Sequence, residues 1–241
     1  MGNTNIDLAR YYPTPKLFAS RQQRAFRELH NCNSSHPCGR LPCKCCGKAM
    51  QRWLVRRCKK TFASSSDLQC VSIIIAVTTA SDKTLSTIDL KRITRTYRNV
   101  IQRAGLSTRL WIGGVDVSRN TYQWDPGKHH WQFQAMLITT PLSKTQWMAL
   151  RACLVKTDEV LRPLRAKNVY ELVGITKYAM KPDFNARYSY VNKEGRRNTF
   201  PTSLKGADLR TLTEQMSDSL HQDRLITIGL RRHGNVLVKT Q

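Results

Sequence analysis

One predicted strand carries the side chains best suited to hold a metal ion. Residues 128–137 (KHHWQFQAML) form a run whose side chains would alternate between the two faces of a strand. One face would consist of Trp131, Phe133, Ala135 and Leu137, and the other of His130, Gln132, Gln134 and Met136. The first face predicts a packed core, while the second presents an imidazole and two amides in a row.

A carboxylate is expected beside this row. If residues 110–118 form the partner strand of a β-hairpin, Asp116 points to the same side as His130 and Gln132. The connection, which includes Asp125–Gly127, is expected to be too long for a two-residue turn. An imidazole, an amide oxygen and a carboxylate form a mixed nitrogen and oxygen site, which suits Mg²⁺ or Mn²⁺ better than structural zinc.

A tyrosine and a lysine at helical spacing form the second candidate site. Residues 168–181 (NVYELVGITKYAMK) predict a helix that Pro182 ends. Tyr178 lies roughly opposite the apolar face of this helix, and Lys181 follows three positions later. A tyrosine placed off the apolar face is available to solvent or to a site, although most helical tyrosines serve packing or the surface.

Six of the eight cysteines fall between positions 32 and 58, which predicts a metal site or disulfides. In a basic chain without an apolar signal segment, zinc is favoured because thiolates persist in a reducing compartment. The spacing C-x4-C-x2-C supplies three ligands, Cys38, Cys43 and Cys46. Cys45 is an alternative to Cys46, and Cys32, His36 or His30 would complete the tetrahedron, with Cys32 as our first choice. Four protein ligands leave no open position, so this zinc would fold the segment.

The charge of the chain indicates its partner. The 241 residues carry 40 Lys and Arg against 16 Asp and Glu, a net charge of +24, which favours nucleic acid. A membrane is the competing partner, but no segment approaches the ~20 apolar residues of a membrane-spanning helix, and residues 1–12 contain no apolar signal core. We therefore expect a soluble, cytoplasmic protein that does not bind membranes.

The remaining patterns predict an α+β fold, with a central, mainly antiparallel sheet covered by helices and a small N-terminal zinc-binding module. The sheet would be centred on residues 71–79 and 130–139. Helices are predicted over residues 21–30, 49–60, 89–104, 141–154 and 208–222, and a closing hairpin over 225–239 with its turn at 233–235. The polar stretch 64–67 separates a basic arm and zinc module (1–62) from the main domain and its basic C-terminal extension (63–241).

Residues 183–206 mix basic and aromatic side chains, a composition that suits single-stranded nucleic acid. Bases can stack on the rings while cations follow the phosphates. The candidate DNA-binding residues are Arg187, Tyr188, Arg196 and Arg197. A solvated basic loop with a few aromatic residues is the commoner explanation of such a segment.

The order of these features resembles that of the rolling-circle replication initiators of plasmids and phages, which belong to the HUH endonuclease class. The resemblance covers about residues 38–182 and is carried by CGRLPCKCC (38–46), IIIAVTTA (73–80) and ITKYAMKP (175–182). The last segment is similar to the Tyr-x-x-Lys motif of that class. It implies that Tyr178 is the nucleophile, that Lys181 is the lysine of the motif, and that residues 63–241 form an HUH-like nuclease domain.

The metal-binding strand departs from the usual His-hydrophobic-His pattern. His130-Trp131-Gln132 looks like the His-hydrophobic-Gln variant of some viral initiators, which implies Mg²⁺ or Mn²⁺ bound by His130, Gln132 and Asp116. A second alignment places Gln134 and Met136 at the ligand positions, and His129 offers a third possibility. Because methionine binds hard cations poorly, the second alignment implies a degenerate site and a protein that only binds DNA.

The resemblance implies that Tyr178 nicks single-stranded DNA at a replication origin, forming a 5′-phosphotyrosine and a 3′-hydroxyl primer. One tyrosine in the motif fits the single-tyrosine class, with Tyr170 as the other candidate. A host helicase and polymerase would be partners, because the chain has no GxxxxGK[ST] loop. The alternatives are a single-tyrosine HUH transposase, a non-catalytic zinc-containing nucleic-acid-binding protein and, more distantly, a basic protein of membrane surfaces.

Overall fold

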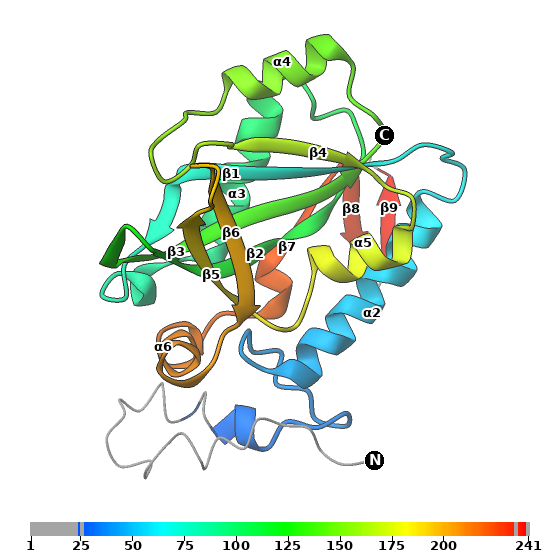
Figure 1. The fold of residues 1–241 in the computed structure, drawn as a ribbon. Coiled ribbons are helices and arrows are strands. Elements are labelled where there is room, and N and C mark those ends of the chain that lie inside the picture. The colour runs from blue at the N-terminus through cyan, green and yellow to red at the C-terminus, as the bar shows by residue number, and fades with distance from the viewer. Residues whose placement is uncertain (1–23, 25–26, 234–235, 240–241) are drawn as a thin grey trace.

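The computed structural model describes residues 24, 27–233 and 236–239, which form a mixed α+β fold (Figure 1). In chain order the elements are α2 (Lys44–Thr61), β1 (Gln69–Ala80), η3 (Leu85–Thr87), α3 (Leu90–Arg103), β2 (Trp111–Tyr122), β3 (Asp125–Thr139), α4 (Lys144–Ala152), β4 (Leu164–Asn168), α5 (Leu172–Ala179), β5 (Asn185–Val191), β6 (Arg197–Ser203), α6 (Gly206–Met216), η4 (His221–Arg224), β7 (Leu225–Ile228), β8 (Leu230–His233) and β9 (Val236–Lys239). Residues 27–30 are also helical, and most of the predicted basic arm lies outside the described residues.

Seven strands form one curled, mainly antiparallel sheet in the order β4-β1-β3-β2-β5-β6, with β7 also paired to β2. The expected centre is confirmed, since β1 and β3 are neighbours inside the sheet and Val71 lies opposite Leu137. β2 and β5 run parallel, whereas the other paired neighbours in this sheet run antiparallel. Strands β8 and β9 form a separate two-stranded ribbon.

The two faces of β3 differ as its alternating sequence predicts. Its four core residues, Trp131, Phe133, Ala135 and Leu137, are fully buried in one cluster with the apolar side of α3. The other face is covered at one end by α2 and α5, where Leu54 and Met180 pack against Ile112 and Ile138. Polar side chains occupy the rest of this face of β3. The candidate site therefore begins at the edge of the area that α2 and α5 cover.

The predicted helices α3 and α4 are confirmed, and both begin at a side-chain cap. The Asp89 carboxylate accepts a hydrogen bond of 2.8 Å from the backbone N–H of Lys91 at the start of α3. At the start of α4, Ser143 and Gln146 form a capping box. The apolar positions predicted for α3 (Leu90, Ile93, Tyr97, Val100 and Ile101) are all buried. None of the helices in the described part of the chain combines the length and apolar character needed to cross a membrane.

The connection between β2 and β3 is shorter than we predicted. Only Gln123 and Trp124 join the strands, and Tyr122 pairs directly with Asp125. The register shifts after Thr121, so the segment that we interpreted as a long loop is instead an irregular, exposed start of β3. Because bulged residues at an exposed strand end need no buried partner, this polar segment fits into the strand.

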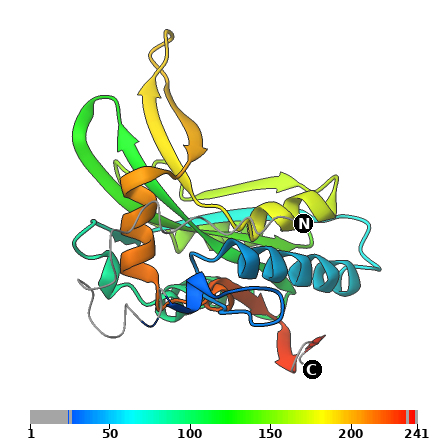
Figure 2. The same ribbon diagram turned by 90° about the horizontal axis from the view of Figure 1, so that it is seen from below.

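Two further strand regions were not predicted. Residues 164–168 form β4 at the edge of β1, so α5 begins only at Leu172 and not at Asn168. Residues 185–203 form the β5–β6 hairpin, which projects from the body of the molecule in Figure 2. Of the C-terminal hairpin predicted over residues 225–239, β8 and β9 are confirmed, with His233 opposite Val236 and residues 234–235 of the turn outside the described residues. Residues 225–228 differ from the prediction, because they form β7 and pair with β2 in the main sheet.

Candidate functional site

The candidate nucleophile lies near the end of α5, on the partly covered face of the sheet. The helix begins at a side-chain cap, in which Glu171 accepts hydrogen bonds from the backbone N–H groups of Val173 and Gly174. Its apolar side packs against the sheet, and Thr176 and Ala179 are buried. The Tyr178 side chain faces away from this contact and is 46% exposed.

Lys181 connects Tyr178 with the sheet. Its Nζ atom lies 5.4 Å from the centre of the Tyr178 ring and 2.9 Å from Oδ2 of Asp116. The Asp116 side chain is 1% exposed, and that of Lys181 is 13% exposed. Burial lowers the pKa of Lys181, while the Asp116 carboxylate acts in the opposite direction. The structure therefore brings together three of the predicted site residues, namely Tyr178, Lys181 and Asp116.

Two arginines add positive charge around Asp116. A guanidinium nitrogen of Arg187 lies 3.5 Å from Oδ2 of Asp116. Arg224 is fully buried, donates to the carbonyls of Val115 at 2.6 Å and Lys181 at 3.2 Å, and has its pKa lowered to about 10 by burial. Three cationic side chains thus surround one carboxylate, an arrangement that attracts anions.

Sequence reasoning did not single out Arg224. It lies in the short η4 segment between α6 and β7, and its sequence neighbours resemble those of many surface arginines. Only its burial against the sheet shows that it belongs to the site.

Removal of the Asp116 charge is expected to destabilise the fold. Asp116→Asn keeps the shape of the side chain but leaves Lys181, Arg187 and Arg224 without their counter-charge. Breaking a buried ion pair in this way costs ~3–5 kcal/mol of the free energy of unfolding, which urea titration would measure. Asp67→Asn, at an exposed position, is the control, and an equal effect of the two variants would contradict the assigned role of Asp116.

The predicted metal-binding row is spread along two strands. Asp116 lies opposite Gln134, whereas Gln132 lies opposite Ser118 and His130 opposite Asn120. Asn120 Nδ2 donates to Oε1 of Gln132 at 3.1 Å and lies 3.2 Å from Nε2 of His130.

Both nitrogens of His130 are engaged, because Nδ1 lies 3.2 Å from the Tyr122 hydroxyl. Burial lowers the pKa of His130, which favours the neutral ring. Both ring nitrogens of His130 and Oε1 of Gln132 therefore face partners within the protein, and Asp116 lies directly opposite neither residue.

The alternative ligand positions differ in their chemistry. Oδ1 of Asp116 and Oε1 of Gln134 are buried and accept no hydrogen bond from the described residues. A carboxylate and an amide oxygen are ligand types that Mg²⁺ and Mn²⁺ accept, but Oδ2 of this carboxylate already pairs with Lys181 and Arg187. Met136 is packed in an apolar cluster with Ala179, and His129 lies 2.8 Å from Asp82 on the opposite face of the sheet.

The four predicted zinc ligands do form a cluster. The sulfur atoms of Cys32, Cys38, Cys43 and Cys46 all lie within 4.8 Å of one another, a grouping that could hold a metal such as zinc. Backbone N–H groups of Cys38 and Gly39 donate to the sulfurs of Cys32 and Cys46 at 3.3 and 3.1 Å. Hydrogen bonds from the neighbouring thiols and from Gly39 lower the pKa of Cys46, whereas hydrogen bonds with Cys43 and Cys46 raise the pKa of Cys38.

The cysteine cluster is tied to the Tyr178 region by direct contacts. Cys43 lies immediately before α2, and its carbonyl accepts a 2.8 Å hydrogen bond from Nε2 of the buried His221. Gln51 of α2 donates to the carbonyl of Lys177 in α5 at 2.8 Å. His221 and Arg224 belong to the same four-residue helix η4. Helices α2 and η4 therefore connect the cysteine cluster with α5 and with the charged site around Asp116.

At Gly47, the backbone of α2 approaches His221 and Pro182 closely. A Cβ atom at this position would lie 2.8 Å from both the His221 ring and the Pro182 side chain. We expect Gly47→Ala to lower the free energy of unfolding by ~1–2 kcal/mol, because overpacking outweighs the gain in helix propensity. Gly127→Ala, which would place its Cβ in open space, should change the melting temperature little, and equal shifts would contradict the close approach at Gly47.

The predicted DNA-binding residues divide between two places. Arg187 reaches the charged site, whereas Tyr188 is 45% exposed on the β5–β6 hairpin, opposite the exposed Phe200. The Arg197 guanidinium lies 4.9 Å from the ring centre of Trp124, which is also exposed. Arg196 is exposed near the hairpin turn, where its backbone N–H donates to Asn192. Sequence reasoning missed Trp124, because its connection was interpreted as a loop.

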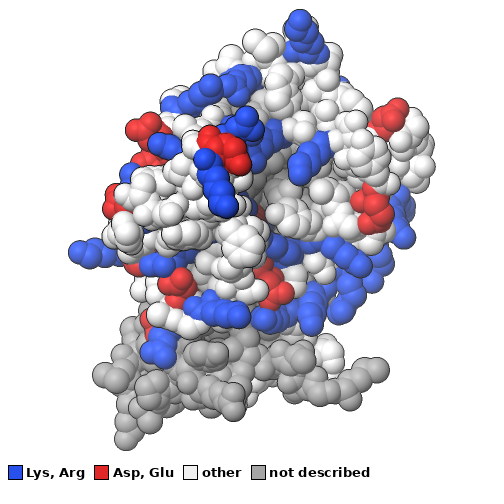
Figure 3. Space-filling model, in the orientation of Figure 1, with Lys and Arg blue, Asp and Glu red and all other residues white. Residues whose placement is uncertain are grey.

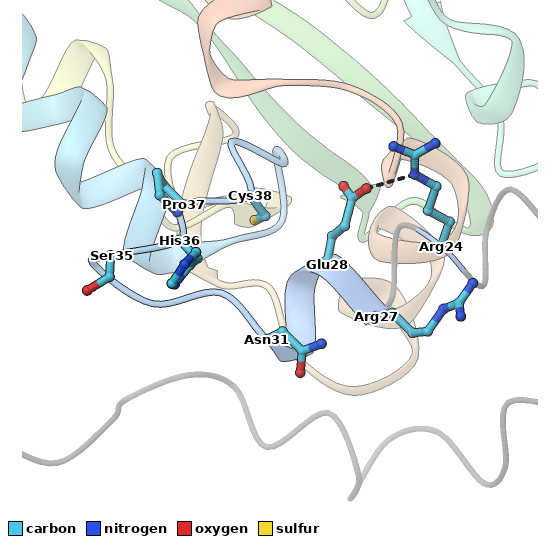
Figure 4. Close-up of a pocket in the computed structure, with 8 residues that line it drawn as sticks. All are labelled: Arg24, Arg27, Glu28, Asn31, Ser35, His36, Pro37 and Cys38. Atoms are coloured by element: carbon cyan, nitrogen blue, oxygen red, sulfur yellow. Dashed lines mark hydrogen bonds and ion pairs between the residues drawn. The ribbon is translucent and has the colours of Figure 1, made fainter.

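A surface hollow beside the cysteine cluster is framed by structural ion pairs. Its lining includes Arg24, Glu28 and Cys38, and Figure 4 shows Arg24 directed toward Glu28. Glu28 also binds Arg40 at 2.7 Å, and these two arginines lower the pKa of its carboxyl group. The ion pairs of Glu28 with Arg24 and Arg40 therefore connect parts of the N-terminal segment to one another.

Comparisons of the chain with models of protein families, with curated proteins and with solved structures give no match.

Proposed function

We propose that the protein nicks single-stranded DNA through Tyr178, as a rolling-circle replication initiator of the HUH endonuclease class does. The observation that carries this proposal is the position of a half-exposed tyrosine beside the ion pair of Lys181 with the buried Asp116. The spacing of Tyr178 and Lys181 agrees with the Tyr-x-x-Lys motif. The net charge of +24 suits a polyanionic substrate.

In the proposed reaction the Tyr178 oxygen attacks the phosphorus of a phosphodiester. A bond from this oxygen to phosphorus forms while the bond from phosphorus to the 3′ oxygen breaks. The phenol loses its proton to solvent, and the leaving oxygen takes up a proton to become a 3′-hydroxyl. The 5′ side remains attached to Tyr178, so the energy of the phosphodiester is conserved for rejoining.

The charged site would help by holding the phosphate. A tyrosine hydroxyl has a pKa near 10, so positive charge close to the phosphate must offset the charge that develops there. Lys181 and Arg187 supply such charge, and Asp116 and Arg224 hold Lys181 in place. A Mg²⁺ or Mn²⁺ ion held by Asp116 and Gln134 would polarise the phosphate when bound.

The exposed rings near the hairpin suit the path of the DNA strand. Tyr188, Phe200 and Trp124 are all more than 40% exposed, and Arg197 lies against Trp124. Rings and cations in this combination bind single strands, since bases stack on the rings and phosphates approach the cations.

A covalent adduct would test the proposal. Purified protein is incubated with an end-labelled, randomised pool of single-stranded DNA and Mn²⁺, followed by a denaturing gel and mass spectrometry of the peptides. The expected result is a nucleotide linked to Tyr178 that EDTA prevents. Tight DNA binding without any adduct in the whole pool would contradict the proposal.

One observation favours a second candidate, a non-catalytic zinc-containing nucleic-acid-binding protein. His130 and Gln132 are both engaged with Asn120, so two of the three predicted metal ligands are occupied within the protein. This candidate predicts salt-sensitive DNA binding that divalent ions do not change and that is not followed by nicking.

A further inference from the structure

We propose that the outer face of α2 is a binding site for double-stranded DNA. Its exposed basic residues are Lys48, Arg52, Arg56, Lys59 and Lys60. The first three are spaced four residues apart and therefore follow one side of the helix. An 18-residue helix is ~27 Å long, so these cations form an extended row.

The row is not neutralised by the protein. The sequence of α2 contains no Asp or Glu, and none of these five side chains forms an ion pair with another residue of the described part of the chain. Figure 3 shows Lys and Arg side chains gathered over the region where α2 runs in Figure 1. A row of unpaired cations is complementary to a row of phosphates.

The surroundings of the row favour a duplex over a single strand. The exposed large apolar and aromatic side chains of the described protein include none from α2. The one aromatic ring of α2, that of Trp53, is partly buried in the apolar cluster shared with α5 and lies 5.9 Å from the Arg57 guanidinium. The row is therefore poorer in exposed rings for base stacking than the β5–β6 hairpin with Tyr188 and Phe200. A duplex presents its phosphates outward and needs no such ring.

The lack of large exposed apolar side chains on α2 also disfavours a membrane as its partner. Helices that lie in a membrane surface insert Trp, Phe or Leu side chains beneath their cations. Leu54 and Cys58 of α2 are instead buried in the cluster shared with α5 and the sheet, and Trp53 is partly buried against the same cluster. The outer face of α2 can therefore contact phosphates without an apolar anchor.

This proposal goes beyond the proposed nicking activity and does not depend on it. Gln51 joins α2 to the helix that carries Tyr178, so a duplex on α2 would lie beside the single-strand site. Duplex binding should be unchanged in Tyr178→Phe, and failure of the nicking proposal would leave it standing.

The test is the salt dependence of binding to a random-sequence 25-base-pair duplex, measured by fluorescence anisotropy. The variant Lys48→Gln/Arg52→Gln/Arg56→Gln removes three cations from α2. Because each phosphate contact contributes ~0.9 to the slope of log K against log salt, the slope should fall in magnitude by ~2.7. Affinity for a single strand of oligo-dT should stay within about twofold, since its site lies elsewhere.

A matched triple variant controls for overall charge. Arg92→Gln/Arg95→Gln/Arg103→Gln removes three exposed cations from α3, which packs on the opposite face of the sheet. Its melting temperature and that of the α2 variant should match the wild type, and its duplex slope should be nearly unchanged. Equal slope losses in the two variants, or no duplex binding by the wild type, would overturn the proposal. So would a larger loss of binding to phosphatidylserine vesicles than to duplex in the α2 variant.

Discussion

Tyr178→Phe is expected to reduce formation of the covalent DNA adduct below detection, while DNA affinity stays within about twofold. The substitution removes only the hydroxyl, which is the proposed nucleophile, and leaves the ring against Lys181. Because the side chain is 46% exposed, loss of its hydroxyl should change stability by less than ~0.5 kcal/mol. The measurement pairs the denaturing-gel assay with anisotropy on the same single strand.

Tyr170→Phe is the matched control for this prediction. Tyr170 lies just before the same helix and is 94% exposed, so it offers a hydroxyl in the same region without the neighbouring Lys181. This variant should form the adduct at the wild-type level. An adduct that persists in Tyr178→Phe, or an equal loss of cleavage and binding, would show that Tyr178 is not the nucleophile.

Loss of one sulfur from the cysteine cluster should strongly destabilise the fold. Cys46→Ala removes a ligand in the first turn of α2, and a bound zinc ion would be lost with it. A metal present at about 1,000 times its Kd contributes ~4 kcal/mol to the free energy of unfolding, and we expect a loss of this size. Elemental analysis would show the metal content, and urea titration the stability.

The loss should spread from the cluster to α5. The Cys43 carbonyl accepts a hydrogen bond from His221, and Gln51 donates one to the Lys177 carbonyl. A displaced α2 would break both hydrogen bonds. Hydrogen exchange should therefore become faster in α2 and in α5 of Cys46→Ala, while β1 keeps its protection. This readout separates a metal that supports the candidate site from one that folds only the N-terminal segment.

Cys45→Ala supplies the control, because Cys45 is adjacent in sequence but does not belong to the four-sulfur group. It should retain the metal and lose less than ~1 kcal/mol. Equal loss of metal in both variants would mean that the cluster includes Cys45 and that the assigned ligand set is wrong.

The sequence by itself determined the elements whose signals are local. The alternation in residues 131–137 predicted the buried face of β3, because neighbouring side chains on a strand point to opposite sides. Helical spacing predicted α3, and the cap at Ser143 marked the start of α4. The dense run of cysteines predicted the four-sulfur group, since its ligands lie within 15 residues of one another.

Tertiary structure alone decided which of the site residues meet. Alternation fixes the face of a strand but not its register, which depends on the turn and on bulges. The short connection at Gln123 and Trp124 therefore placed Asp116 opposite Gln134 and not beside His130.

The groups around Asp116 come from more distant parts of the chain: Lys181 after α5 and Arg187 in β5 pair with its carboxylate, and Arg224 in η4 bonds to the carbonyls of Val115 and Lys181 beside it. No local pattern signals these contacts, because they form only when the folded sheet and the helices packed on it bring distant residues around one buried carboxylate.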